Sequence, residues 1–253
     1  MIILTRKKGS ILAHTLNYKT PPKYKTYKDR AVDKFHDQEC ISKEDFEAMS
    51  ALCCHYCGKD GPNGIDRIDN QIGYIKENCV PACKHCNYVK GDLSLEDFNV
   101  WKNRFIAKQL AERTVGKTPL FYGGDLTAPI AYKWKISWNE TAKNVSFYNQ
   151  YPEFSHNEFM GWTSHPVEKP FAVFDIQSSF ERPRIAERMS LTDSMLSGKR
   201  PKASVITLEG ESLVRQFLWG LALADMTSIY GAILNGVDPT PVGLIEKFKA
   251  SLS

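Results

Sequence analysis

Residues 118–123 read Thr-Pro-Leu-Phe-Tyr-Gly, a short apolar run that is followed by a second glycine, Gly124. A run of this length, bounded by glycine, predicts a buried β-strand. Two similar runs lie at Phe171–Asp175 and Ala203–Thr207, and stretches with helical spacing separate the three. Strands that alternate with helices form parallel sheets, so this part of the chain is predicted to be α/β.

Helical patterns surround these strands. Ser94 and Asp97 form a capping box ahead of a helix predicted over about residues 95–114. Two more helices are predicted near the C-terminus, a long apolar one at about 211–234 and a short one at about 240–250. No glycine-rich dinucleotide fingerprint follows Gly124, so the glycine pair gives little support for a nucleotide site.

The composition is that of a globular protein. The chain has 253 residues, of which 42% are hydrophobic and 25% charged, with a formal net charge of +4. These values exclude a disordered, collagen-like or coiled-coil chain. Continuous apolar stretches such as Phe217–Leu223 are far shorter than the ~18 residues of a membrane span, and Met1–Arg6 has no apolar signal-peptide core. We therefore expect a cytoplasmic location and no membrane partner.

Cysteine is confined to the first third of the chain. Two Cys-x-x-Cys pairs, Cys54 with Cys57 and Cys83 with Cys86, are separated by 25 residues. Four thiolates at this spacing predict a closed tetrahedral site for structural zinc, because a catalytic site would keep one position open. The other three cysteines are expected to be buried filler: Cys40, Cys53 and Cys79.

The segment around these pairs resembles the zinc-knuckle branch of the HNH endonuclease family, over about residues 50–98. The resemblance rests on three runs: Gly64–Asn70, Gly73–Ala82 and Tyr88–Phe98. It implies a small ββα module that holds one catalytic divalent metal, Mg²⁺ or Mn²⁺. The matching positions are Asp66 as a metal ligand, Asn78 as the asparagine that fixes the loop, and Asn87 as a candidate second ligand.

The sequence departs from that family at Arg67, where the family has a water-activating histidine. A guanidinium cannot act as a general base near neutral pH. Arg67, Lys84 and Lys90 would nevertheless suit contacts with phosphate. Three interpretations stay open: a metal-dependent DNA endonuclease, a zinc module that binds nucleic acid without cleaving it, and a zinc site with no ligand.

The first 30 residues form a basic stretch with tyrosines between the charges. Asp29 is its only acid, whereas its basic residues are Arg6, Lys7, Lys8, Lys19, Lys23, Lys25, Lys28 and Arg30. Such an arm would suit phosphate neutralisation and base stacking. A solvated terminal tail explains the same composition equally well.

A second resemblance covers about residues 106–253. Several runs, in the right order, are similar to the C-terminal sugar-isomerase (SIS) domain of bifunctional phosphoglucose/phosphomannose isomerases: Ala131–Lys135, Trp138–Lys143, Tyr151–Glu158, Arg182–Arg188 and Gly236–Val242. The resemblance implies a three-layer, flavodoxin-like α/β fold and a homodimer whose second copy helps to form the active site.

That family interconverts glucose 6-phosphate or mannose 6-phosphate and fructose 6-phosphate without a cofactor. The resemblance assigns the base that moves a proton between C1 and C2 to Glu140, the ring-opening histidine to His156, and an assisting lysine to Lys249. A carboxylate and an imidazole suit these proton transfers near neutral pH. Each residue alone has a simpler explanation as a surface or capping side chain.

The family's enzymes contain two SIS domains, and the first one supplies the Ser/Thr-rich loop that binds the sugar phosphate. This chain has the cysteine module at that place. The expected organisation is therefore a basic arm (1–30), an HNH-like zinc module (31–105) and one C-terminal SIS domain (106–253). Two interpretations of this organisation stay open. The chain is half an isomerase fused to a candidate DNA-binding module, or a mobile HNH element has entered an isomerase gene and the fused product has no joint function.

Overall fold

A computed structural model describes residues 23–34, 40–164 and 168–252; for residues 31–34 it describes the backbone only. The chain divides into an N-terminal unit, Met1–Lys102, and a C-terminal unit, Asn103–Ser253. This division lies close to the predicted boundary after residue 105. Residues 1–22 of the predicted basic arm fall outside the described residues.

The C-terminal unit is built on a four-stranded sheet whose strands all run parallel, in the order β4-β3-β5-β6. The strands are β3 (Thr118–Gly123), β4 (Phe147–Gln150), β5 (Phe171–Gln177) and β6 (Ser204–Thr207). The three strands expected from the sequence are thus confirmed. The edge strand β4 was not predicted, because its residues Phe-Tyr-Asn-Gln are mostly exposed and lack an apolar alternation.

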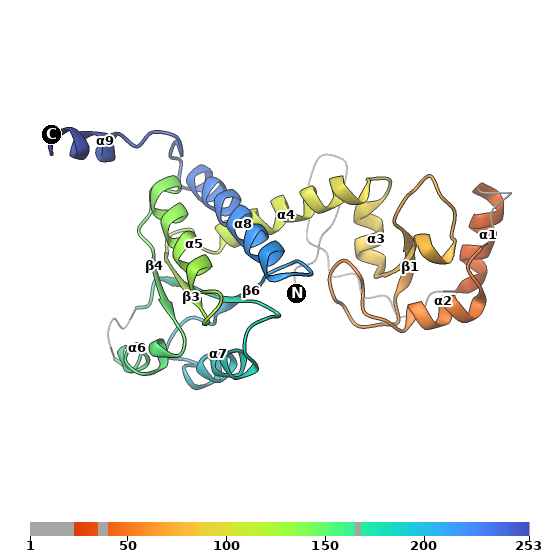
Figure 1. Ribbon diagram of the computed structural model, residues 1–253, viewed down its shortest axis with the longest axis horizontal. Coiled ribbons are helices and arrows are strands. Elements are labelled where there is room, and N and C mark those ends of the chain that lie inside the picture. The colour runs from red at the N-terminus through yellow and green to blue at the C-terminus, as the bar shows by residue number, and fades with distance from the viewer. Residues whose placement is uncertain (1–22, 35–39, 165–167, 253) are drawn as a thin grey trace. The chain divides into compact units, whose positions relative to one another are not determined.

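Helices cover both faces of this sheet (Figure 1). On one face α5 (Ala128–Thr141), α8 (Leu213–Leu234) and the end of α4 (Leu95–Glu112) enclose a core around Phe121, Trp134 and Trp138. On the other face η2 (Glu153–Ser155), α6 (Glu158–Gly161) and α7 (Pro183–Met195) cover Leu120 and Tyr122. Successive residues of a strand point to opposite faces, so β3 serves both cores and the predicted three-layer α/β fold is confirmed.

Helix α8 is long and apolar enough to cross a membrane by length and composition. The sequence analysis predicted this helix at about 211–234 but did not count it as long and apolar enough for a membrane span, because Arg215, Gln216 and Asp225 interrupt its apolar runs. In the structure α8 packs on α5 and the sheet core. A Cβ added at Gly231 would lie 2.6 Å from a ring carbon of Trp138, so glycine allows this close approach.

The N-terminal unit contains the ββα order that the resemblance implies. Strands β1 (Gly64–Arg67) and β2 (Cys79–Ala82) pair antiparallel, with the short helix η1 (Lys76–Asn78) before β2 and helix α3 (Lys84–Lys90) after it. Two further helices, α1 (Tyr24–Lys34) and α2 (Lys43–Ser50), precede the hairpin.

Residues 24–30 differ from the predicted separate arm, because they belong to α1 and contribute to the core of the unit. Tyr27 is buried against Phe46 and Tyr74, and its hydroxyl accepts a hydrogen bond of 3.1 Å from the backbone N–H of Ile65. The segment in which Lys and Tyr alternate thus forms a helix that buries an aromatic face and exposes a basic one.

Candidate functional site

Glu140 lies in the last turn of α5, with an exposed side chain. Helix α5 runs back from the carboxyl end of β3 to the amino end of β4, so Glu140 lies beside the amino edge of the sheet. The loop after α8 reaches the same place, since Lys143 Nζ donates both to the Glu140 carbonyl (2.6 Å) and to the Pro239 carbonyl (3.2 Å).

His156 lies at the other edge. It follows η2, which begins just after the carboxyl end of β4, and its side chain is exposed. A 14-residue helix such as α5 is about 21 Å long at 1.5 Å per residue. A single copy of the chain therefore does not bring the Glu140 carboxylate and the His156 imidazole together.

Lys249 lies on the last helix, α9 (Gly243–Ala250), none of whose residues is buried. Its apolar side chains are exposed as well, with Leu244 at 86% and Phe248 at 63%. The three residues that the resemblance singled out are thus all solvent-accessible on separate elements.

A polar group at the carboxyl edge was missed by the sequence analysis. The Glu158 carboxylate accepts a hydrogen bond from the Tyr122 hydroxyl at the end of β3, and another, of 2.8 Å, from the Asn149 side-chain amide on β4. Burial, followed by the neighbouring Glu158 charge, raises the pKa of Tyr122 above its ordinary value, so the hydroxyl remains a donor. The sequence signal for this group was the run Tyr151–Glu158, which contains His156 and ends at Glu158.

A buried ionic group lies under the sheet. Arg200 has a fully buried side chain, 3.7 Å from the Asp193 carboxylate and 5.8 Å from the ring centroids of Tyr122 and Phe154. Asp175, on β5, is 2% exposed, and its Oδ1 accepts no hydrogen bond from any residue that the structure describes. Burial raises the pKa of the Asp175 carboxyl to about 7, against the opposing effect of Arg200.

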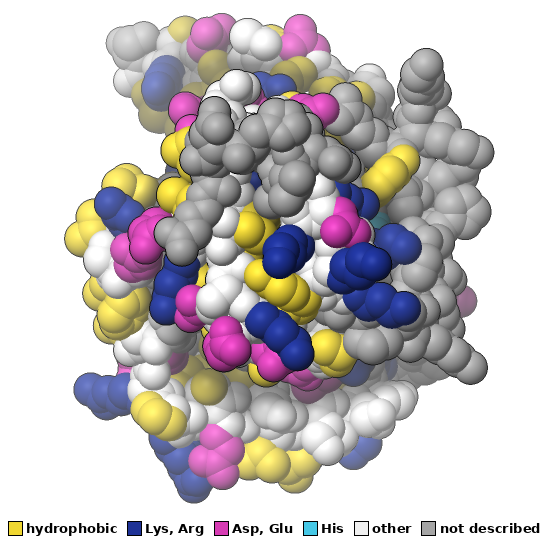
Figure 2. All heavy atoms as spheres, turned by 90° about the vertical axis from the view of Figure 1, so that its right-hand side faces the viewer, with side chains coloured by type: hydrophobic (Ala, Val, Ile, Leu, Met, Phe, Trp, Pro, Cys, Tyr) yellow, Lys and Arg dark blue, Asp and Glu magenta, His cyan; other side chains and the backbone are white. Residues whose placement is uncertain are grey.

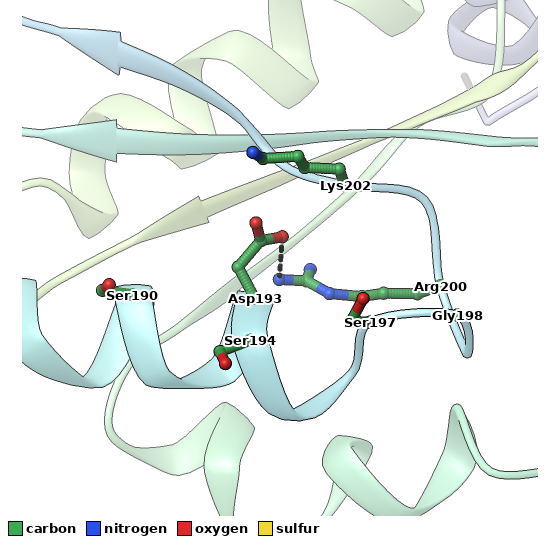
Figure 3. Close-up of a pocket in the computed structure, with 7 residues that line it drawn as sticks. All are labelled: Ser190, Asp193, Ser194, Ser197, Gly198, Arg200 and Lys202. Atoms are coloured by element: carbon green, nitrogen blue, oxygen red, sulfur yellow. Dashed lines mark ion pairs between the residues drawn. The ribbon is translucent and has the colours of Figure 1, made fainter.

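Next to this group is a pocket of about 550 Å³ between α7 and the segment that leads into β6 (Figure 3). In Figure 3 the Asp193 side chain extends from α7 toward Arg200 and Lys202. The lining is polar, with Ser190, Ser194 and Ser197 completing it. Asp193 and Arg200 both line the pocket, although the Arg200 side chain itself has no solvent exposure.

The four cysteines of the Cys-x-x-Cys pairs come together in the N-terminal unit. Their sulfurs lie within 4.8 Å of one another, and the Sγ atoms of Cys57 and Cys83 are 3.8 Å apart. Three of the four are buried. Of the cysteines expected to be filler, Cys79 is buried and Cys40 half-buried, but Cys53 is exposed and donates to Asp60 Oδ1. The filler prediction is therefore wrong for Cys53.

Asp66 is engaged by neighbouring side chains rather than open. Its Oδ2 accepts a 2.6 Å hydrogen bond from the Tyr56 hydroxyl and lies 3.1 Å from the ammonium of Lys90, which is fully buried. Lys90 Nζ also donates to the Arg67 carbonyl at 2.9 Å. A divalent cation at Asp66 would be repelled by this ammonium, so Asp66 does not fit the role of a ligand for Mg²⁺ or Mn²⁺.

Arg67 is turned inward. Its guanidinium donates to the carbonyls of Asn70 and Ile72 and lies 5.0 Å from the ring centroid of Tyr74. The expected phosphate contacts of Arg67 and Lys90 are therefore wrong, because both cations are buried and used within the unit. Lys84 is exposed.

The two asparagines of the HNH-like segment bond to the backbone. The Asn78 amide donates to the carbonyls of Asp69, Ile72 and Gly73, and its oxygen accepts from the Asp69 N–H, which ties the loop between β1 and η1. The Asn87 amide donates to the Ile65 carbonyl at 3.0 Å. Asn87 therefore joins α3 to β1.

The outer face of α1 is basic, with Lys25, Lys28 and Arg30 exposed. Figure 2 views the molecule from the side on which α1 and α2 lie in Figure 1, and it shows lysine and arginine side chains interspersed with apolar side chains and with Asp and Glu.

Comparison with known proteins covers mainly the C-terminal unit. At 33% identity over 145 residues, the chain is similar to a bifunctional phosphoglucose/phosphomannose isomerase of Aquifex aeolicus, covering 57% of this chain and 45% of the relative. A protein of the same name from Thermoplasma volcanium is 31% identical over 137 residues, or 53% of this chain and 43% of that one. The chain thus spans less than half the length of these curated relatives.

Among solved structures, a glucose-6-phosphate isomerase like protein from Thermus thermophilus is similar with a TM-score of 0.45 and 23% identity, over 55% of this chain and 46% of that chain. The model of the bacterial phospho-glucose isomerase C-terminal SIS domain matches residues 104–252, most of the chain. The chain therefore belongs to the family of the bacterial phospho-glucose isomerase C-terminal SIS domain.

Proposed function

We propose that the C-terminal unit supplies half of the active site of a sugar-phosphate isomerase that interconverts glucose 6-phosphate or mannose 6-phosphate with fructose 6-phosphate. The observation that carries the proposal is the family membership of residues 104–252, together with the exposure of Glu140, His156 and Lys249. The chemistry needs no metal: the Glu140 carboxylate takes the proton from C2 of the open-chain aldose as O1 gains a proton, and it returns its proton to C1 of the enediol as O2 loses one. The His156 imidazole moves the hydroxyl proton during ring opening.

Because Glu140 and His156 lie at opposite edges of the sheet, we propose that each site combines Glu140 of one copy with His156 of a second copy. The exposed apolar residues of α9 support such a dimer, since Leu244, Phe248 and Leu252 lie uncovered in a single chain. Lys249, on the same helix, would then be carried to the dimer interface.

The proposal is tested with the full chain and the N-terminal half of the Aquifex aeolicus relative, in a coupled assay that converts fructose 6-phosphate to glucose 6-phosphate. We expect activity only in the mixture, because the sugar phosphate needs the first SIS domain. Glu140→Gln should lower kcat roughly a hundredfold or more, since the amide cannot accept the carbon-bound proton. The exposed Glu112→Gln is the matched control and should leave the rate unchanged. No activity in the mixture would contradict the proposal.

The shared site predicts a specific mixing result. Glu140→Gln and His156→Asn should each be inactive, yet a reassociated equimolar mixture should recover about a quarter of the wild-type activity, because half the dimers then hold one intact site. If Glu140 and His156 of the same copy formed one site, no mixed dimer would contain an intact site and activity would stay absent.

For the N-terminal unit we propose a structural zinc site and binding to nucleic acid without cleavage. Zinc–sulfur bonds of about 2.3 Å in a tetrahedron place the sulfurs about 3.8 Å apart, the separation of Cys57 and Cys83. Cys54, Cys57, Cys83 and Cys86 would hold the metal. Cleavage is disfavoured because Asp66 is paired with Lys90 and Arg67 replaces the expected base.

DNA binding is tested by fluorescence anisotropy with a labelled duplex. We expect the affinity for the duplex to fall steeply as the salt concentration rises. Changing Lys25, Lys28 and Arg30 to Ala should lower the affinity and make it less dependent on salt, because each change removes a contact with phosphate. The control variant replaces three exposed lysines of the C-terminal unit, Lys117, Lys199 and Lys247. No nicking of plasmid is expected with Mg²⁺ or Mn²⁺. Salt-insensitive or undetectable binding would leave the zinc site as a stabilising element only.

A further inference from the structure

The loop between β3 and α5 is the place where a parallel α/β fold usually offers backbone N–H groups to a phosphate. In this chain the N–H groups of Gly124 and Leu126 in the loop, and that of Ala128 at the start of α5, already have partners within the chain. The Gly124 N–H donates to the Thr127 hydroxyl at 2.7 Å, and that hydroxyl donates to the Ile176 carbonyl on β5 at 2.8 Å. Pro129, in the first turn of α5, has no N–H to offer.

A carboxylate from another loop accepts the hydrogen bond of the Leu126 N–H. Glu181, between β5 and α7, is 8% exposed, and its Oε2 accepts a 2.9 Å hydrogen bond from the Leu126 N–H. Its Oε1 accepts from the N–H of Arg182 at 3.2 Å. The carboxylate lies so close to the loop that a Cβ added at Gly124 would overlap it. The same Cβ would lie 2.6 Å from the Ile185 side chain, so glycine is needed at 124 for the close approach of Glu181 and Ile185.

A second negative charge belongs to the same loop. Asp125 is paired with the exposed guanidinium of Arg182 at 3.6 Å. A phosphate that approached this turn would meet the Glu181 and Asp125 carboxylates and would find the Leu126 N–H engaged. Like charges at a few ångströms oppose binding by several kT near a protein surface.

We infer that Glu181 is an internal substitute for phosphate at the β3–α5 turn, a positioning residue that closes the anion site of this SIS unit. The phosphate of a sugar substrate must then be bound by groups outside this turn. Only the identity of that substrate rests on the proposed isomerase function. The occupation of the turn by Glu181 stands on the contacts alone and is tested without measuring isomerisation.

The first test uses the wild-type chain and inorganic phosphate, with the backbone amides followed by ¹H–¹⁵N NMR. We expect no saturable chemical-shift changes of the Gly124 and Leu126 amides at millimolar phosphate. A titration with sodium chloride at equal ionic strength is the control for non-specific effects. Saturable shifts in the wild type would overturn the inference, because the turn would then be an open phosphate site.

The second test removes the internal anion. Glu181→Ala should lower the midpoint of thermal unfolding, and phosphate should raise that midpoint again in the variant but not in the wild type. Glu181→Gln is the matched control, since its amide keeps the volume and an acceptor oxygen and should remain insensitive to phosphate. A folded Glu181→Ala protein that ignores phosphate would also contradict the inference. Should that variant fail to fold, the wild-type titration decides.

Discussion

Replacing Cys86 with Ser is expected to abolish zinc binding and to unfold the N-terminal unit while the C-terminal unit stays folded. A structural zinc site contributes about 10–16 kcal/mol of apparent binding free energy, which is folding free energy when the site does not exist in the unfolded chain. A small domain has a total stability of only about 5–15 kcal/mol, so the loss exceeds what the remaining contacts supply. The core around Tyr27, Phe46 and Ile65 is small and cannot compensate.

The measurement is zinc content by mass spectrometry together with thermal unfolding of the full chain. We expect one zinc per wild-type chain and two unfolding transitions, of which Cys86→Ser or a strong chelator removes the first. Cys53→Ser is the matched control, because Cys53 is exposed and lies outside the four-cysteine cluster. A zinc-free protein that retains both transitions would contradict the assignment.

Asp175→Asn is expected to stabilise the C-terminal unit at high pH and to have little effect at low pH. The pKa of Asp175 is raised from 3.8 to about 7 by burial, so the folded state binds this proton more tightly than the unfolded state does. The stability of the wild type therefore falls as pH rises from about 4 to about 7 and is flat above that range, a total on the order of 4 kcal/mol at 1.36 kcal/mol per pKa unit. Asn resembles the neutral acid and removes this slope.

Denaturant unfolding at pH 5 and pH 8 measures the effect. The stability difference between Asp175→Asn and wild type should grow by about 2–3 kcal/mol between these two pH values, since about two pKa units fall within that window. Glu187→Gln, which removes an exposed carboxylate on α7, should show no comparable growth. A difference that is independent of pH would show that Asp175 is ionised in the folded protein throughout this range.

Local sequence patterns predicted most of the fold. The apolar runs at 118–123, 171–175 and 203–207 became β3, β5 and β6, and the capping box at Ser94 began α4. The edge strand β4 was missed because an edge needs pairing on one side only and carries little apolar signal. The inclusion of residues 24–30 in a core was missed because a basic composition hides the buried face of α1, which Tyr27 forms.

The candidate sites divide in the same way. Sequence alone determined the two Cys-x-x-Cys pairs, the absence of the expected histidine at Arg67, and the motifs around Glu140 and His156, because these are properties of residue type and spacing. Tertiary structure alone decided that Glu140 and His156 lie at opposite edges of the sheet, that Lys90 neutralises Asp66, and that Glu181 fills the β3–α5 turn. The physical reason is that charge pairing and hydrogen bonding depend on distances of a few ångströms between residues far apart in the chain, which no local pattern encodes.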